Sequence, residues 1–469
     1  MSHELEKHKK YKHKYGCMER FWGLGIEEET YFQFVKPLHV AAPICRTAHK
    51  PERYSVDYYK TFKKGYLNDF DSYFTDLQGF YDLPFFFNSH SFLKIDNSGN
   101  HALTYEKIPK PNNKYQGISF FEKLQDWNPQ IFKDEYERSF TFDGDTIEFI
   151  TQEFYQARID LVIQELISQK ERFLYSINQY LVTNKIHREK GLLRYPPRNP
   201  GFAVFHSNPS NVLMFNNGTY HINITLPTIL DNESKILLPQ LFRKQHQSMI
   251  RLIQWLEPLL IAAYGSPDPL SEISKRYAKG SQRCAISRYI GVGTFDSEKM
   301  PEGKILQVER ATHPLATNPL WWYTRYHKES AYLALDRIGL DINYKKHYNH
   351  GIEIRFFDWF PEDRLRDLLE LVVYVGEYSY IGEIQSCTAL ESWNDTVLGV
   401  FQEGPQHRLS KAALASYEKI FRCELLGNAH TALDALSIIT KSLKSRYKHS
   451  FLAKLFIHGG DESFCETCV

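Results

Sequence analysis

Acidic residues and one histidine recur in four short segments in which apolar and polar residues alternate. The segments cover residues 24–32, 145–151, 220–227 and 351–358. Side chains along a β-strand point alternately to its two faces, so every second residue of such a segment faces the same way. The alternation therefore predicts four strands, each with an apolar face for a core and an opposite face that presents a carboxylate or an imidazole.

The first two segments supply three carboxylates. Glu27 and Glu29 share one face of the first strand, roughly 7 Å apart, and Glu148 stands among large apolar residues in the second. Like charges at that spacing repel one another in a partly buried site unless a cation lies between them. Divalent metal binding is one interpretation, and charged strands facing water are the other.

The third and fourth segments supply an imidazole, an amide and a guanidinium. His221 and Asn223 share a face of the third strand, whereas Glu353 and Arg355 share a face of the fourth. Histidine is a common metal ligand, and arginine can grip a phosphate or a carboxylate. Taken alone, His221 could instead be a hydrogen-bonded structural residue, and Glu353 and Arg355 could form a simple ion pair.

Taken together, the four segments predict a metal centre. Carboxylates with one imidazole suit Mg²⁺ or Mn²⁺ better than Zn²⁺. Clustered divalent metals with arginines nearby are typical of phosphoryl transfer from ATP. The predicted ligands are Glu27, Glu29, Glu148, His221 and Glu353.

The same segments resemble the glutamate–cysteine ligase family of the glutamine synthetase superfamily. The order of the motifs along the chain also matches that family. The similar stretches are GIEEE at 25–29, IEFIT at 147–151, HINITLP at 221–227, LLIAAYGSPDP at 259–269 and IEIRFFD at 352–358.

This resemblance implies an α+β fold: a funnel-like, mostly antiparallel curved sheet of the glutamine synthetase type, with helices packed on its outer face. It also implies an ATP-dependent carboxylate–amine ligase. The substrate carboxylate would be the γ-carboxylate of glutamate, the amine could be cysteine, and an acyl phosphate would link the two half-reactions. Glutathione biosynthesis would be the corresponding pathway.

The resemblance also implies roles for single residues. Glu27, His221 and Glu353 would hold one metal, and Glu29 and Glu148 the others. Arg355 would contact the γ-phosphoryl group or the substrate carboxylate. A further arginine is expected within residues 280–296, where the chain offers Arg283 and Arg288.

These two arginines are five residues apart, so a straight strand would turn them to opposite faces. From its Ser-x-Arg similarity to the family we prefer Arg283 for catalysis and expect Arg288 at the nucleotide. The resemblance implies that Asn223 lies at the nucleotide or metal edge. A structural ion pair is the other interpretation of Arg283.

Long helices must position the strands. Apolar residues recur at helical spacing within 152–181 and 240–262, and Pro361 followed by two acidic residues predicts a helix over 361–381. Residues 405–458 are also expected to be mostly helical. The expected organisation is a mobile basic tail at 1–20, a catalytic domain at 21–385 with a long aromatic-rich insertion at 36–135, and a mostly helical region at 386–469 that ends in a tail.

Composition excludes several classes of protein. The 469 residues are 42% hydrophobic and 24% charged, which is typical of a globular chain, and the net charge of +1 gives no field for nucleic acid or for an anionic membrane. No apolar run reaches the length of a membrane span and no secretory signal is visible. Seven scattered cysteines suit a reducing compartment, so we expect a cytoplasmic protein.

Two other functions are compatible with the same residues. A guanidino-type phosphotransferase shares the distant sheet architecture and would make no amide. A non-catalytic relative would bind nucleotide or a partner without turnover. The sequence leaves the amine, the oligomeric state and the role of the terminal Cys465 and Cys468 open.

Overall fold

The structure is a computed structural model of the chain. It describes residues 20–35, 102–103, 126–127, 140–143, 146–154, 156–196, 218–231, 236–267, 279–281, 342–343, 351–387 and 390–459. Arg283 and Arg288, the insertion at 36–135 apart from two short pieces, and both chain ends lie outside these ranges.

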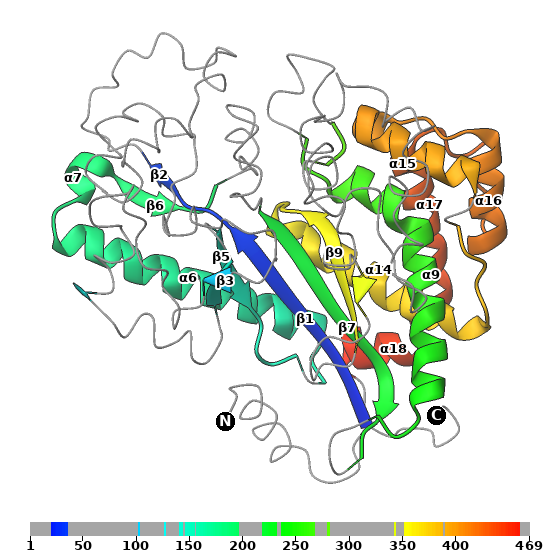
Figure 1. Ribbon diagram of the computed structural model, residues 1–469, viewed down its shortest axis with the longest axis horizontal. Helices are drawn as coiled ribbons and strands as arrows, with labels where there is room; N and C mark the ends of the chain where they lie inside the picture. Colours follow the sequence, from blue (N-terminus) through cyan, green and yellow to red (C-terminus); the bar gives the residue numbers. More distant parts are fainter. Residues whose placement is uncertain are drawn as a thin grey trace, which may run out of the picture.

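An antiparallel sheet forms the centre of the described chain (Figure 1). Its strand order is β3-β4-β5-β1-β7-β9-β8, and β3 and β8 are its two edges among the described strands. The strands are β1 (Arg20–Thr30), β3 (Ala102–Leu103), β4 (Phe140–Asp143), β5 (Thr146–Ile150), β7 (Thr219–Ile229), β8 (Ile342–Asn343) and β9 (Ile352–Asp358). A separate two-stranded sheet pairs β2 (Gln33–Val35) with β6 (Leu192–Arg194).

Mixed helix and antiparallel strand is the α+β arrangement expected from the sequence. The main sheet is open within the described residues, and its further curvature into a funnel stays a prediction. The four acidic or imidazole-bearing segments all form strands, as their alternation predicts. They occupy β1, β5, β7 and β9, which are consecutive in the sheet.

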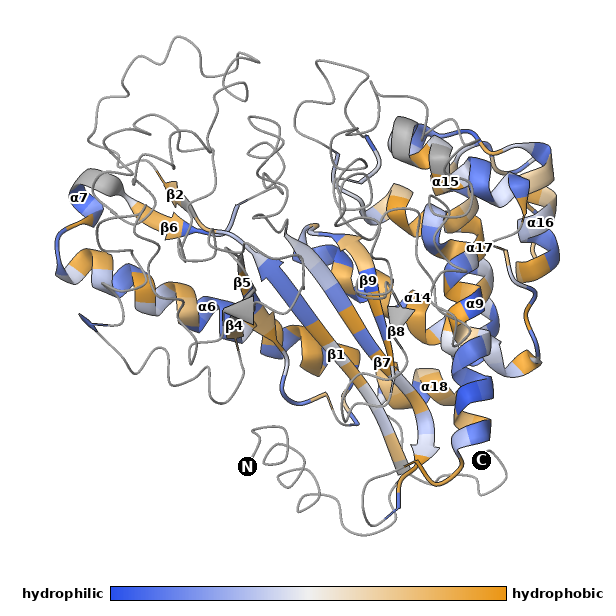
Figure 2. Cartoon of the chain, in the orientation of Figure 1, coloured by the Kyte–Doolittle hydropathy of each residue, from blue (hydrophilic) through white to orange (hydrophobic). Residues whose placement is uncertain are grey.

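Three long helices cover the apolar face of the sheet: α6 (Ile159–Thr183), α9 (Pro239–Tyr264) and α14 (Leu365–Tyr378). Phe173 of α6 packs edge-on against Phe149 of β5, with ring centroids 5.6 Å apart. His246 of α9 accepts a hydrogen bond from the backbone N–H of Leu226 in β7 at 3.0 Å. In Figure 2, polar and apolar residues follow one another along β1 and β7, as expected of strands with one apolar and one polar face.

The C-terminal helices form a further layer that packs on α9 and α14 rather than on the sheet. They are α15 (Glu391–Glu403), α16 (Lys411–Phe421), α17 (Ala432–Tyr447) and α18 (Phe451–Ala453), with the short π-helical turn η14 (Lys454–His458). The short helices α7 (His187–Lys190), η11 (Glu362–Arg364), η12 (Ser379–Ile381) and η13 (Gly404–Gln406) complete the described elements. The helical character predicted for 405–458 is confirmed, and these helices share one hydrophobic core with those on the sheet.

Two predicted helix starts are wrong. The helix expected from residue 152 begins at Ile159, because Thr151, Phe154 and Gln156 still pair with β1: Leu24 N–H donates to the Phe154 carbonyl at 2.9 Å. Pro361 precedes a 3₁₀ turn, and the α-helix begins only at Leu365. No helix among the described residues is long and apolar enough to cross a lipid bilayer.

Candidate metal centre

Strand register brings the predicted ligands onto one face of the sheet. Glu27 of β1 lies opposite His221 of β7, and Glu29 of β1 lies opposite Glu148 of β5. On the other side of β7, Asn223 lies opposite Glu353 of β9. Three separate strand pairings therefore gather groups that are more than 300 residues apart in the chain. Their placement on one face agrees with the sequence prediction, and metal ligation by them remains to be tested.

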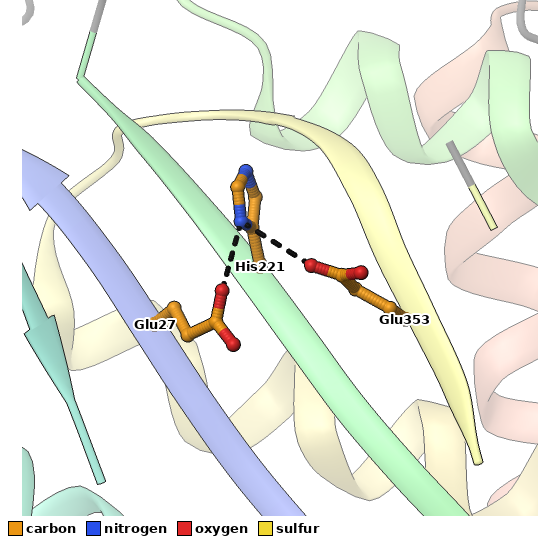
Figure 3. Close-up of side chains that lie close together, drawn as sticks. All are labelled: Glu27, His221 and Glu353. Carbon is orange, nitrogen blue, oxygen red and sulfur yellow. Dashed lines mark hydrogen bonds and ion pairs between the residues drawn. The ribbon is translucent and has the colours of Figure 1, made fainter. Parts of the chain in front are cut away.

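Glu27, His221 and Glu353 form the first group (Figure 3). The Nδ1 atom of His221 lies 3.2 Å from a carboxylate oxygen of Glu27 and 3.6 Å from one of Glu353. All three residues are buried, and one potential ligand atom from each lies within 4.8 Å of the others. Two carboxylates that share a buried imidazole form a set of donors suited to a cation.

Glu29, Glu148 and His221 form a second group on the other side of the imidazole. The Nε2 atom of His221 lies 3.6 Å from a carboxylate oxygen of Glu29 and 3.3 Å from the hydroxyl of Thr219. One potential ligand atom each of Glu29, Glu148 and His221 again lies within 4.8 Å of the others. Glu148 is half-buried, so this group is the more accessible of the two.

The two groups share a single histidine, and this limits how both groups can bind a cation at the same time. A neutral imidazole carries one lone pair, because its second nitrogen holds the proton. If Nδ1 of His221 is the ligand of a cation in the first group, Nε2–H is a donor that faces Glu29. A ligating histidine commonly donates its other N–H to a carboxylate in this way. A cation in the second group would then rest on carboxylates alone.

The spacing of the donors fits a divalent ion after a small adjustment. Ligand atoms on opposite sides of an octahedral Mg²⁺ are about 4.2 Å apart, and neighbouring ones about 3 Å. The 3.2 and 3.6 Å distances at Nδ1 of His221 lie within that range. The upper limit of 4.8 Å in each group exceeds it by about half an ångström, which rotation of a glutamate side chain can close.

Arg355 lies at the edge of the first group, next to a break in strand pairing. Tyr220 pairs with Phe357 and Ile222 with Ile354, so His221 alone opposes both Arg355 and Phe356. Such a bulge bends the strand and re-aims its side chains. An Nη1 atom of Arg355 donates to Glu353 at 3.2 Å. The ion pair that the sequence allowed is therefore present, and it lies within the acidic group rather than apart from it.

Asn223 lies beside the first group. Its side-chain N–H donates to the second carboxylate oxygen of Glu27 at 3.1 Å, which leaves the first to face His221. Asn223 thus orients Glu27. Contact of Asn223 with a nucleotide stays a prediction, as do the roles of Arg283 and Arg288 outside the described residues.

The end of β5 is held to β1 by a threonine. The Thr151 hydroxyl accepts from the Ile26 N–H at 2.9 Å and lies 3.2 Å from the Ile26 carbonyl, to which it can also donate. Gly25 leaves room for this crossing, because a Cβ atom there would lie 3.3 Å from Phe154 and 3.4 Å from the Thr151 hydroxyl. These contacts fix Glu27 and Glu148 on adjoining strands.

Sequence reasoning missed the middle glutamate of the GIEEE stretch. Glu28 is 0% exposed and lies on the apolar face of β1, opposite to Glu27 and Glu29. Its carboxylate lies 2.6 Å from Nζ of Lys170 in α6 and accepts from the Trp359 indole at 2.9 Å. Burial by itself would lower the pKa of Lys170, but the nearby carboxylates of Glu28 and Glu362 raise that pKa overall, so the ammonium form is favoured. A lysine among the apolar residues of a predicted helix was the available signal.

Comparison with known proteins places the chain in a family. It is 34% identical over 451 residues to the uncharacterized protein R704 of Acanthamoeba polyphaga mimivirus, a match that covers 96% of this chain and 78% of that protein. The chain belongs to the same family as R704. No protein-family model matches the chain. Because the match spans 96% of this chain, it includes segments that form the sheet and segments that form the C-terminal helices. The resemblance to glutamate–cysteine ligases stays a prediction.

Proposed function

We propose that this family binds divalent cations, Mg²⁺ or Mn²⁺, on the acidic face of the sheet and uses them as an ATP-dependent carboxylate–amine ligase. One observation carries the proposal: a buried imidazole lies between two groups of carboxylates, with an arginine at the edge. Such a face is unfavourable without cations, because like charges within a few ångströms repel strongly where water is scarce.

The reaction would join a carboxylate to an amine in two steps. An oxygen of the substrate carboxylate attacks the γ-phosphorus of ATP, the bond to the β-phosphate oxygen breaks, and an acyl phosphate and ADP form. The amine nitrogen then attacks the acyl carbon, loses a proton and expels phosphate, which leaves an amide. Bound cations would neutralise the triphosphate and hold donor and acceptor in line. Glutamate is the proposed carboxylate and cysteine a candidate amine.

The residues of the chain have separate tasks in this proposal. The carboxylates and His221 hold the cations, and Asn223 orients Glu27 for that purpose. Arg355 carries its positive charge beside Glu353, where it can stabilise charge on the transferring phosphoryl group. Arg283 is proposed to add a second guanidinium, and Arg288 to contact the nucleotide. No side chain acts as a covalent nucleophile.

The proposal extends to the shape of the sheet and to the location of the protein. We propose that the complete sheet curves as a glutamine synthetase-like funnel, with ATP on the acidic side and helices on the outer side. The support is the division of the two faces: α6, α9 and α14 cover the face opposite to the ligands. A cytoplasmic location, where ATP and Mg²⁺ are present, belongs to the same proposal.

The test is cation-dependent ATP turnover with glutamate and a panel of amines that includes cysteine. The wild type is expected to release phosphate only when a cation, a carboxylate and an amine are all present. Glu353→Gln should abolish that release. Glu370→Gln, which alters a carboxylate of α14 that is ion-paired with Lys444 at 2.9 Å, is the matched control and should leave it intact.

Other outcomes would point elsewhere. Transfer of phosphate to a guanidine, with no amide formed, would favour a guanidino-type phosphotransferase. Binding of Mg-ATP in calorimetry without turnover of any substrate would favour a non-catalytic nucleotide-binding protein. Equal turnover by the wild type and Glu353→Gln would remove the assignment of the metal centre.

A further inference from the structure

A buried charged cluster lies directly behind the candidate metal centre, on the other face of the sheet. The Glu28 carboxylate, the Lys170 ammonium and the Trp359 indole are in hydrogen-bonding contact there. Lys170 also forms an ion pair with Glu362. The side chains of Lys170 and Glu28 are 3% and 0% exposed, whereas that of Glu362 is 32% exposed.

This cluster connects the two strands that supply the first group of ligands. Glu28 lies on β1 between Glu27 and Glu29. Glu362 opens the 3₁₀ turn that follows β9, the strand of Glu353. The strands β1 and β9 do not pair with each other, because β7 lies between them. One ammonium from α6 therefore contacts β1 directly and is linked to β9 through the turn that follows that strand.

The contacts of Lys170 oppose a repulsion between carboxylates on the face of the candidate metal centre. The carboxylates of Glu27 and Glu353 approach within 4.8 Å of each other across β7 before any cation is bound. Their repulsion pushes β1 and β9 apart on that face. On the opposite face, the Lys170 ammonium attracts Glu28 of β1 and Glu362 in the turn after β9, and this attraction opposes the movement.

We propose that Lys170, together with Glu28 and Glu362, is a positioning group that holds the cation ligands of β1 and β9 at binding distance, although it touches no cation. The inference rests on the proposed cation binding. A buried ion pair often adds little net stability and can be replaced by apolar residues. The expected role is therefore seen in cation affinity more than in the stability of the fold.

Glu362→Gln tests this most cleanly, because Glu362 is partly exposed and its replacement leaves Glu28 paired with Lys170. Loss of a group that hydrogen-bonds a metal ligand typically weakens metal binding by 10–100-fold, and Glu362 acts less directly, through Lys170. We expect about tenfold weaker Mn²⁺ binding in calorimetry, at the lower end of that range, with little change in the midpoint of thermal unfolding. Glu370→Gln is the control and should bind as the wild type does. Wild-type affinity in Glu362→Gln would overturn the proposal.

A second measurement separates this proposal from the proposed function. Backbone amides of residues 24–30 and 352–358 should exchange hydrogen faster in metal-free Glu362→Gln than in the metal-free wild type, and those of α17 should not. If exchange is unchanged, the positioning role is overturned whether or not Mn²⁺ binds. If exchange is faster but the wild type binds no Mn²⁺, the connection stands and the proposed cation site falls. The double variant Glu28→Gln/Lys170→Met, which leaves no buried charge unpaired, should behave like Glu362→Gln.

Discussion

Replacement of Glu27 by glutamine should raise the stability of the metal-free protein while weakening its response to cations. The side chain of Gln has nearly the size of Glu and still offers an oxygen to the Asn223 amide, which now bonds to Glu27 at 3.1 Å. The charge is lost, and an amide N–H replaces the oxygen that lies 3.2 Å from Nδ1 of His221. Because Glu27 and Glu353 place oxygens within 4.8 Å of each other, the change removes a like-charge contact from a buried position.

The size of the effect follows from that separation. At the upper limit of their separation, 4.8 Å, two unit charges repel by about 3.5 kcal/mol at an effective dielectric constant of about 20. Arg355 beside Glu353 offsets part of this repulsion. We therefore expect the free energy of unfolding of metal-free Glu27→Gln to exceed that of the wild type by about 1–3 kcal/mol.

Bound cations should stabilise the wild type more than Glu27→Gln and so reverse the difference in their unfolding free energies. A ligand at a hundred times its dissociation constant stabilises the folded state by about 2.7 kcal/mol. Wild type should gain about that amount from Mn²⁺, and Glu27→Gln much less, since one of its anionic ligands is gone. Urea unfolding in a chelator and then in Mn²⁺ measures both quantities, with Glu370→Gln as the control.

The reasoning would be refuted if metal-free Glu27→Gln were less stable than the wild type, since the carboxylates would then not repel one another in the folded state. It would equally be refuted if Mn²⁺ stabilised both proteins by the same amount. In that case Glu27 would not be a cation ligand.

Two further predictions concern the packing of the strands that carry the candidate metal centre. Burial lowers the pKa of His246 to about 4, below the value of about 6.5 expected in the unfolded chain, so its contribution to stability is complete above pH 6.5 and is lost as pH falls toward 4. This loss is about 2 kcal/mol between pH 7 and pH 5, and urea unfolding at both values should show a flatter pH dependence in His246→Gln. Thr151→Val leaves the Ile26 N–H without the hydroxyl that it now donates to, which should cost about 1–3 kcal/mol of unfolding free energy by the same measurement; a loss below 0.5 kcal/mol would show that another group replaces the hydroxyl.

The sequence predicted the strands and their faces because both follow from local alternation. Glu27, Glu29, His221 and Glu353 stand at positions that alternate with mostly apolar residues, Glu28 being the exception, and burial of the apolar residues decides which way each one points. The α+β class followed from the same patterns together with the helical spacing of the segments between them.

The grouping around His221 could not be predicted, because it depends on pairing between distant strands. A change of two residues in the register of β1 against β7 would keep every side chain on its face and still separate Glu27 from His221. The bulge at Arg355 and Phe356 is equally invisible in the sequence, since it adds a residue to β9 without interrupting the apolar pattern. The sequence alone therefore does not decide whether Glu353 and Arg355 form a simple ion pair or belong to a larger site.

The run of three glutamates in β1 shows how one stretch of sequence can serve two environments. Alternation sends Glu27 and Glu29 to the face of the candidate metal centre and Glu28 into the core, where a lone carboxylate would be costly. Lys170 offsets part of that cost, and it does so from the centre of a helix whose other buried residues are apolar except for Gln169. The chain thus places negative charge on both faces of one strand and balances it differently on each, by a fixed ammonium behind the sheet and, in our proposal, by exchangeable cations in front. Because the ion pair of Lys170 with Glu28 does not depend on bound cations, we expect β1 to keep its position while cations bind and leave the opposite face.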